Sequence, residues 1–290
     1  MKGGKYVVQA NLQLPDSPFC PGYSYQNCGG DATYIILPED VMKQDCLLPY
    51  KGETYFEGSL IEPLSCVIGA FNANYHLIEG TYDHKMGIKE GGNLLILGGT
   101  GPMGLLAIDY ALHGDKKPKT IVVTDVNKDR LKKASELYKS EEGITVHYVD
   151  TSNIENSEEY LRNLVNGGFD DIFIFAPVAE LVTQGSKLLN NDGCLNFFAG
   201  PQNKDFSAEI NFYDIHYSFT HYVGTSGGNT EDMRTAIRLI EEKKVNVAKV
   251  VTHILGLDSV VETTLNQPEI ERSKKVVYTQ KKFDLKSLDE

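Results

Sequence analysis

Short apolar runs alternate with amphipathic stretches through the middle of the chain. The apolar runs suit buried parallel strands, and they lie at residues 93–97, 120–124, 145–149, 171–176, 194–199 and 220–224. Between them, apolar residues recur every three or four positions, which predicts helices at 102–113, 127–138, 157–164 and 179–189. Strands that alternate with helices in this way predict an α/β fold built on a doubly wound parallel sheet.

The flanking segments have a different pattern. Residues 1–58 predict strands at 6–10 and 32–37 joined by loops, with no helix. A helix is expected over 59–77, with Ser59 and Glu62 at the spacing of a capping box. After a helix over 231–243, strands are expected at 250–254 and 275–279, with a further helix near 258–265. The chain is therefore expected to divide at 1–58, 59–228 and 229–290.

The first apolar run leads directly into a glycine-rich turn. Gly99, Gly101 and Gly104 form the pattern G-x-G-x-x-G between a predicted strand and a predicted helix. Gly99 is expected to permit the tight turn, Gly101 to let a pyrophosphate approach the backbone, and Gly104 to let the helix pack closely on the sheet. Pro102 and Met103 begin the helix, whose unpaired N–H groups and positive dipole end favour phosphate binding.

An acid and three strand ends extend this candidate site. Asp125 closes the second strand about twenty residues past the last glycine, where an acid is expected to accept hydrogen bonds from a ribose diol. Ligands of open α/β sheets bind at the carboxyl ends of the strands. Candidate contacts to adenine and nicotinamide therefore follow the last three strands, although ordinary turn chemistry would explain them equally well: Ala176, Pro177, Phe198, Ala199, Gly200, Thr225 and Ser226.

Charge and cysteine content narrow the class of protein. The 290-residue chain has a net charge of −12, which argues against nucleic acid and anionic membrane surfaces as partners. The longest apolar runs are far shorter than the roughly 20 residues that span a bilayer, and the first residues lack the apolar core of a signal peptide. Five scattered cysteines without a C-x-x-C motif are typical of reduced thiols, so a cytoplasmic location is expected.

Several strings taken together resemble a known family. The chain contains Gly-Gly-Asp-Ala-Thr-Tyr at 29–34, Glu-Pro-Leu at 62–64, Gly-Gly-Thr-Gly-Pro-Met-Gly at 98–104 and Val-Thr-His-Ile at 251–254. These strings resemble the zinc-type medium-chain alcohol and polyol dehydrogenases. The longer strings at 197–201 and 223–230 resemble the branch of L-sorbose 1-phosphate reductases. The resemblance covers essentially the whole chain.

The resemblance implies a fold, a cofactor and a chemistry. Residues 1–58 would be the remaining part of a GroES-like catalytic domain to which 229–290 return, with the Rossmann domain at 59–228. The chain is expected to lack an upstream Cys and a Gly-His-Glu motif, so it would be an N-terminally shortened member. Glu62 would stand at the third zinc-ligand position, and a helix start with Ser59 is the competing interpretation.

The implied reaction is hydride transfer between a nicotinamide cofactor and a ketose phosphate or polyol phosphate, of the L-sorbose 1-phosphate and D-glucitol 6-phosphate type. NAD is expected, with NADP possible because Lys128 and Arg130 follow Asp125 closely. The sequence does not identify catalytic residues in this chain. The alternative function is a nucleotide-binding remnant without zinc or turnover. Aromatic residues at 206–224, together with the resemblance, predict a homodimer or homotetramer.

Overall fold

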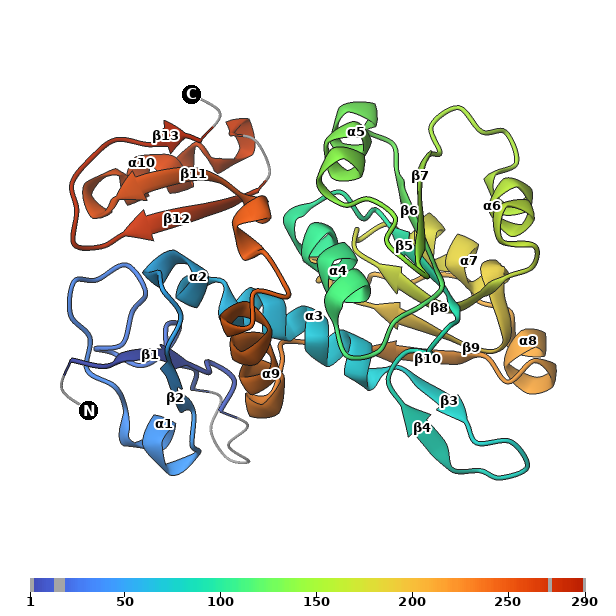
Figure 1. Cartoon of the computed structure of the whole chain (residues 1–290), viewed down its shortest axis with the longest axis horizontal. Helices are drawn as coiled ribbons and strands as arrows, with labels where there is room; N and C mark the ends of the chain where they lie inside the picture. The colour runs from blue at the N-terminus through green and yellow to red at the C-terminus, as the bar shows by residue number, and fades with distance from the viewer. Residues whose placement is uncertain (1–2, 13–18, 271–272, 289–290) are drawn as a thin grey trace. The chain divides into compact units, whose positions relative to one another are not determined.

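The computed structural model describes residues 3–12, 19–270 and 273–288 and divides the chain into two compact units (Figure 1). Unit 2 is the continuous stretch Val67–Ser226, whereas unit 1 combines Met1–Cys66 with Gly227–Glu290. The predicted boundaries lay at 58/59 and 228/229, and the assignment of the outer segments to a catalytic domain stays a prediction.

Unit 2 is built on a six-stranded parallel sheet, which confirms the predicted doubly wound fold (Figure 1). The strand order is β10-β9-β8-β5-β6-β7. Chain order reverses between β5 and β8, so the sheet has a topological switch point there. The strands are β5 (Asn93–Leu97), β6 (Thr120–Asp125), β7 (Thr145–Asp150), β8 (Phe169–Ile174), β9 (Leu189–Phe197) and β10 (His221–Gly224).

Helices cover both faces of this sheet (Figure 1). Because strand-to-strand crossovers are right-handed, α4 (Pro102–His113) and α5 (Lys128–Leu137) lie on one face, and α6 (Ser157–Val165) and α7 (Ala179–Leu188) on the other. Alternate residues of β5 face the two layers: Leu95 and Leu97 join the core beneath α6 and α7. The short helix α8 (Phe212–Tyr217) precedes the edge strand β10.

Local signals fix where two of these helices begin. The side chain of Asn127 accepts a hydrogen bond from the Arg130 N–H at 3.0 Å, so Asn127 caps α5 and the helix expected from residue 127 begins there. The cap of α6 is Asn156, whose side chain accepts from the Glu159 N–H, although Ser157, the first residue of the expected helix, is also of a type that caps helices. Both residue types can accept this bond, so the sequence alone gives two adjacent candidates.

Unit 1 is made from the two outer segments of the chain. Its first segment holds β1 (Lys5–Val8), α1 (Glu39–Lys43), β2 (Leu47–Tyr50) and α2 (Tyr55–Ser59). Its second segment holds α9 (Thr230–Glu241), β11 (Val251–Gly256), α10 (Val260–Leu265), β12 (Lys274–Tyr278) and β13 (Lys286–Ser287), with 3₁₀ turns at Val247–Val250, Leu257–Ser259 and Gln267–Glu269. β1 pairs with β2 antiparallel, and β11 lies between β12 and β13.

Hydrogen bonds join the two segments of unit 1. The Gln9 side chain donates to the Gly228 carbonyl at 3.1 Å, and the Lys51 N–H donates to Glu241 Oε1 at 2.7 Å. The segment 45–53 therefore makes contacts with residues that lie about 190 positions later in the chain.

Four sequence expectations for the first 90 residues are wrong. The helix expected over 59–77 is instead the end of α2, then α3 (Ile61–Ala73), then strand β3 (Tyr75–Leu77), which pairs with β4 (His84–Met86). Ser59 does not cap a helix, because its hydroxyl donates to the Phe56 carbonyl at 2.7 Å. The segment 1–58 contains two short helices, α1 and α2, and the alternating residues 32–37 form no strand in the part of the chain that the structure describes.

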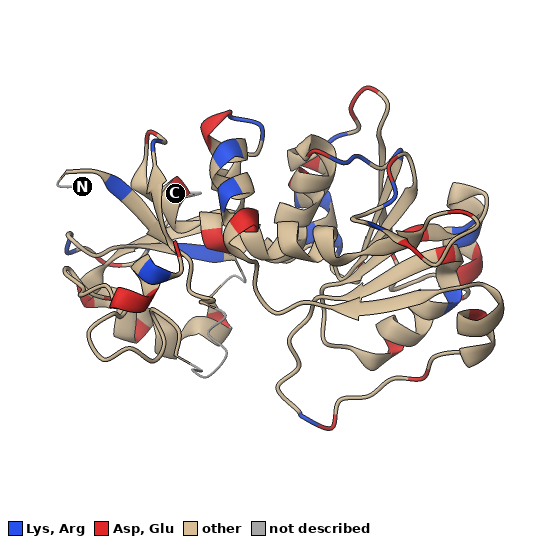
Figure 2. Ribbon diagram, turned by 90° about the horizontal axis from the view of Figure 1, so that it is seen from below, with Lys and Arg blue, Asp and Glu red and all other residues tan. Residues whose placement is uncertain are grey.

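Charged side chains lie mainly on helices and loops, with acidic and basic positions interspersed (Figure 2). Within the described ranges, none of the helices has both the length and the apolar character needed to cross a membrane.

Candidate functional site

The glycine-rich loop after β5 packs tightly against its surroundings. Gly98 has φ +68°, so it supplies the left-handed residue of the turn, a role that the sequence had assigned to Gly99. Gly99 is small for another reason: a Cβ there would lie 2.6 Å from Ile96 Cγ2 and 2.9 Å from Val123 Cγ1. The turn thus needs one glycine for its backbone angle and the next for space.

Gly101 and Gly104 have opposite surroundings. A Cβ on Gly104 would lie 2.3 Å from the Gly99 carbonyl oxygen, so α4 contacts the loop too closely for any side chain. A Cβ on Gly101 would meet no atom within 4 Å, so the space next to its backbone is open. Pro102 occupies the first position of α4 and is followed by Met103. The open backbone therefore lies where the helix begins and its N–H groups lack helical partners.

Asp125 ends β6 and lies against this loop. Its Oδ2 accepts hydrogen bonds from the Thr100 hydroxyl at 2.5 Å and the Thr100 N–H at 3.3 Å. Its Oδ1 accepts from the N–H groups of Val126 and Asn127 at 2.8 and 3.1 Å. Four donors thus fix the position and orientation of the carboxylate beside the start of α4. The role of Asp125 in ribose binding stays a prediction.

The strand-end candidates lie along the same edge of the sheet, because β8, β9 and β10 run parallel to β5. Ala176 follows β8 and lies close to the loop after β5: a Cβ on Gly98 would come within 2.8 Å of the Ala176 Cβ. The N–H groups of Phe198 and Ala199 both donate to the Ile174 carbonyl, at 3.1 and 3.0 Å. The remaining candidates occupy the same loops: Pro177, Gly200, Thr225 and Ser226.

One hydroxyl in this group is unsatisfied. The Thr225 side-chain oxygen is buried and has no hydrogen-bond partner among the described residues. A buried hydroxyl without a partner costs about 1–3 kcal/mol, so a ligand group that bonds to it would be favoured. With the open backbone at Gly101, this oxygen indicates that the residues present fit a polar ligand such as a dinucleotide.

The predicted zinc ligand Glu62 lies on α3, in unit 1. Its Oε1 accepts a hydrogen bond from the Cys66 thiol at 3.2 Å. Burial, and after it the neighbouring Glu62 carboxylate, raise the pKa of the Cys66 thiol to about 12. Catalytic zinc uses three protein ligands. No three His, Cys, Asp or Glu side chains come together for a metal ion in the described part of the chain, so these residues do not fit a catalytic zinc.

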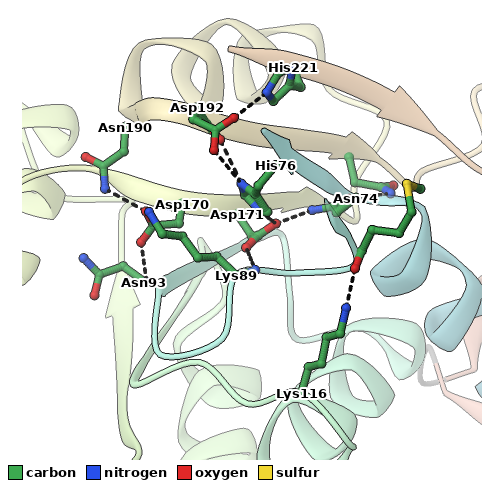
Figure 3. Close-up of polar contacts among 12 residues, drawn as sticks. Asn74, His76, Lys89, Asn93, Lys116, Asp170, Asp171, Asn190, Asp192 and His221 are labelled. Atoms are coloured by element: carbon green, nitrogen blue, oxygen red, sulfur yellow. Dashed lines mark hydrogen bonds and ion pairs between the residues drawn. The ribbon is translucent and has the colours of Figure 1, made fainter. Parts of the chain in front are cut away.

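A buried polar network, which the sequence did not predict, lies at the opposite end of the sheet in unit 2 (Figure 3). His76 of β3 lies 3.2 Å from Asp171 Oδ1 through Nε2 and 2.8 Å from the Asp192 carbonyl oxygen through Nδ1. Asp171 also accepts from the Asn74 side chain at 2.6 Å and from the Lys89 N–H at 2.8 Å. These contacts hold the β3–β4 hairpin on the sheet.

The geometry of the network sets the charge of His76. Both imidazole nitrogens face oxygen atoms, and the Asp171 carboxyl group also accepts from the Asn74 side chain and the Lys89 N–H. Of the forms of His76, only the imidazolium donates from both nitrogens, so this arrangement favours the protonated ring. Burial lowers the pKa of His76, but hydrogen bonding and attraction to Asp171 and Asp192 outweigh it, so the pKa is raised overall. No signal in the local sequence pairs residues that lie 95 positions apart.

Comparison with known proteins agrees with this fold. A family model described as "Zinc-binding dehydrogenase" matches residues 102–242, which contain the start of α4, Asp125 and the strand-end loops. The six-stranded parallel sheet with helices on both faces is the fold of the zinc-dependent medium-chain dehydrogenases, and the small sheets of unit 1 fit part of a GroES-like domain. The chain belongs to the zinc-binding dehydrogenase family.

The similar proteins are longer than this chain. An L-sorbose 1-phosphate reductase of Klebsiella pneumoniae is 62% identical over 289 residues, which cover 99% of this chain and 70% of that protein. A mannitol-1-phosphate 5-dehydrogenase of Aliivibrio fischeri is 45% identical, covering 99% and 69%. The crystal structure of a 2R,3R-butanediol dehydrogenase from Bacillus subtilis matches with a TM-score of 0.68 at 21% identity, covering 87% and 64%. The chain thus spans about two thirds of their lengths.

Proposed function

We propose that the chain binds a nicotinamide dinucleotide along the glycine-rich loop and acts within a polyol-phosphate oxidoreductase. The observation that carries this proposal is the combination at one sheet edge of the open backbone at Gly101, the start of α4 and the fixed carboxylate of Asp125. The activities named for the Klebsiella and Aliivibrio relatives support a sugar or polyol phosphate as substrate, with L-sorbose 1-phosphate and D-glucitol 6-phosphate as first candidates.

The residues of this chain would bind and orient the cofactor. The N–H groups at the start of α4 would bind the pyrophosphate, and Asp125 would accept the ribose hydroxyls. The loops that contain Ala176, Phe198 and Thr225 would contact the rest of the dinucleotide. A bound nicotinamide supplies hydride chemistry, and the protein contributes position and exclusion of water.

NAD is the expected cofactor, because a 2′-phosphate would meet the negative charge of Asp125. Isothermal titration of the purified chain with NADH and NADPH tests this expectation. NADH should bind at least about tenfold more tightly, which corresponds to about 1.4 kcal/mol. Tighter binding of NADPH would contradict the assignment of Asp125, and failure to bind either nucleotide would refute the proposed function.

A second candidate is nucleotide binding without turnover by this 290-residue chain. The observation that favours it is Glu62, which accepts from the Cys66 thiol but belongs to no group of three potential metal ligands among the described residues. Elemental analysis and an assay of L-sorbose 1-phosphate reduction with NADH separate the two candidates. Substoichiometric zinc and negligible turnover together with NADH binding support the second candidate. About one zinc per chain with measurable turnover supports the first.

We further propose a homodimer or homotetramer formed through the edge strand β10. This strand has a sheet neighbour on only one side, and edge strands invite pairing. The segment before it exposes aromatic side chains, which are enriched in interface cores. Phe212 is 73% exposed, and the others exceed half exposure: Tyr213, Tyr217 and Phe219. A two-fold contact between equivalent edges would cover them.

A further inference from the structure

A charged pair lies next to the predicted ribose site. Lys128 is the first residue of α5, and its Nζ lies 3.5 Å from Asp150 Oδ2 at the end of β7. Asp150 is held in place by Ser152, whose N–H and hydroxyl donate to Oδ1 at 2.9 and 2.5 Å. The pair therefore joins the beginning of a helix to the end of the neighbouring strand.

The position of Lys128 is not explained by the stability of its helix. A cation in the first turn interacts unfavourably with the positive end of the helix dipole. The Asp150 carboxylate supplies the compensating charge. Hydrogen bonds from Ser152, followed by attraction to Lys128, lower the pKa of Asp150, so this carboxylate stays ionised at neutral pH.

The sheet register places the two acids side by side. Asp125 and Asp150 are partners in the parallel pairing of β6 with β7, so their side chains leave the same face of the sheet from strands about 4.8 Å apart. Asp125 is fixed by four donors, none of which carries a charge. The edge thus presents two negative charges, and Lys128, the cation that lies beside Asp150, already has a carboxylate partner.

We propose that Asp150 is a specificity-determining residue of the dinucleotide site, which excludes a 2′-phosphate by holding Lys128 and by its own charge. This inference rests on the proposed function. A 2′-phosphate carries about −1.5 to −2 charges at neutral pH and needs a nearby cation. Lys128 could provide that cation only by leaving Asp150, which would then remain as a second uncompensated negative charge next to Asp125.

The test is a double-mutant cycle read by nucleotide affinity. Dissociation constants for NADH and NADPH are measured by titration calorimetry for the wild type, Asp150→Asn, Lys128→Gln and the double variant. Asp150→Asn should lower the ratio of the NADPH to the NADH constant about five- to tenfold, mainly through tighter NADPH binding. Lys128→Gln should change NADPH affinity less than about twofold alone, but about fivefold in the Asp150→Asn background.

Asp129→Asn is the matched control, because it removes an exposed acid next to Lys128 on the same helix. In Asp129→Asn, the ratio of the NADPH to the NADH dissociation constant should stay within about twofold of the wild-type ratio. The effect of Asp150→Asn should also shrink at 0.5 M salt, since the Debye length falls towards 3 Å near 1 M. Thermal unfolding of each variant checks that the fold is kept.

The outcomes separate the two proposals. An unchanged ratio in Asp150→Asn, or an equal effect of Lys128→Gln in both backgrounds, overturns the role of Asp150 while leaving nucleotide binding intact. If the wild type binds neither nucleotide, the proposed function fails and this inference fails with it.

Discussion

Replacement of His76 tests the buried network most directly. In the variant His76→Leu, the Asp171 carboxylate and the Asp192 carbonyl each lose a charged donor, at 3.2 and 2.8 Å in the wild type. Hydrogen bonds to charged groups contribute about 1.5–3 kcal/mol each. Asp171 keeps its bonds from Asn74 and Lys89, and leucine adds apolar burial. The expected loss of stability is therefore about 3 kcal/mol at pH 6.

The same variant makes a prediction about pH. The pKa of His76 is raised in the folded protein, so its contribution is complete below the unfolded pKa of about 6.5 and is lost as pH rises through the folded pKa. The stability difference between wild type and His76→Leu should be largest at pH 6 and should shrink as the pH is raised to 9. The pKa of His113 is also raised, but His113 is present in both proteins and cancels in the difference.

Urea unfolding followed by far-ultraviolet circular dichroism measures this difference, since the chain contains no tryptophan. His84→Leu is the matched control: His84 lies on the same hairpin, is exposed, and should change stability by less than about 0.5 kcal/mol. A loss below about 1 kcal/mol for His76→Leu at pH 6, or a difference that does not vary with pH, would refute the assignment of a buried imidazolium.

Three further predictions concern other parts of the molecule. Gly104→Ala should destabilise the chain by about 1–3 kcal/mol and weaken NADH binding, whereas Gly101→Ala should keep the fold. Equal urea midpoints for the two variants would contradict the expected difference in stability. Cys66 should react with iodoacetamide at pH 8 about a thousandfold more slowly than an ordinary thiol, because its pKa is raised to about 12. If mass spectrometry shows that Cys66 is labelled as fast in the folded protein as in the denatured protein, this prediction is wrong. Light scattering at micromolar concentration should give the molar mass of a dimer or tetramer for the wild type and a smaller mass for Tyr217→Asp. A monomeric mass for the wild type would exclude the β10 interface.

The parts of the fold that the sequence predicted are those with local causes. The β5–α4–β6 unit follows from continuous apolar strands and glycines whose steric roles are set by immediate neighbours, as at Gly104. The cap at Asn127 is likewise a contact over three residues. In these places periodicity and short-range chemistry agree, so the pattern predicts the structure.

The failures have long-range causes. The expected helix 59–77 ends early, at Ala73, where Asn74 donates to Asp171 and Asn196 donates to Asn74, at separations of 97 and 122 residues. Apolar and polar residues alternate over 32–37 as they do in a strand, but Tyr34 is 88% exposed. Without a neighbouring strand to pair with, this segment is not stabilised in an extended conformation. Contacts between residues so far apart in the chain cannot be predicted from local patterns in a single sequence.

The discontinuous composition of unit 1 has a consequence for how the protein is made. Gln9 can bond to Gly228 only after 219 further residues have been synthesised, and Lys51 can bond to Glu241 only after 190. At a synthesis rate of about 5–20 residues per second, the first interval lasts about 10–40 s. Unit 2 emerges whole during that time and can fold on the ribosome. The strands β1 and β2 emerge before unit 2, but their segment contacts the second segment of unit 1 only after unit 2 has been synthesised, so the early nascent chain is the stage at which these edges are open to aggregation or chaperone binding.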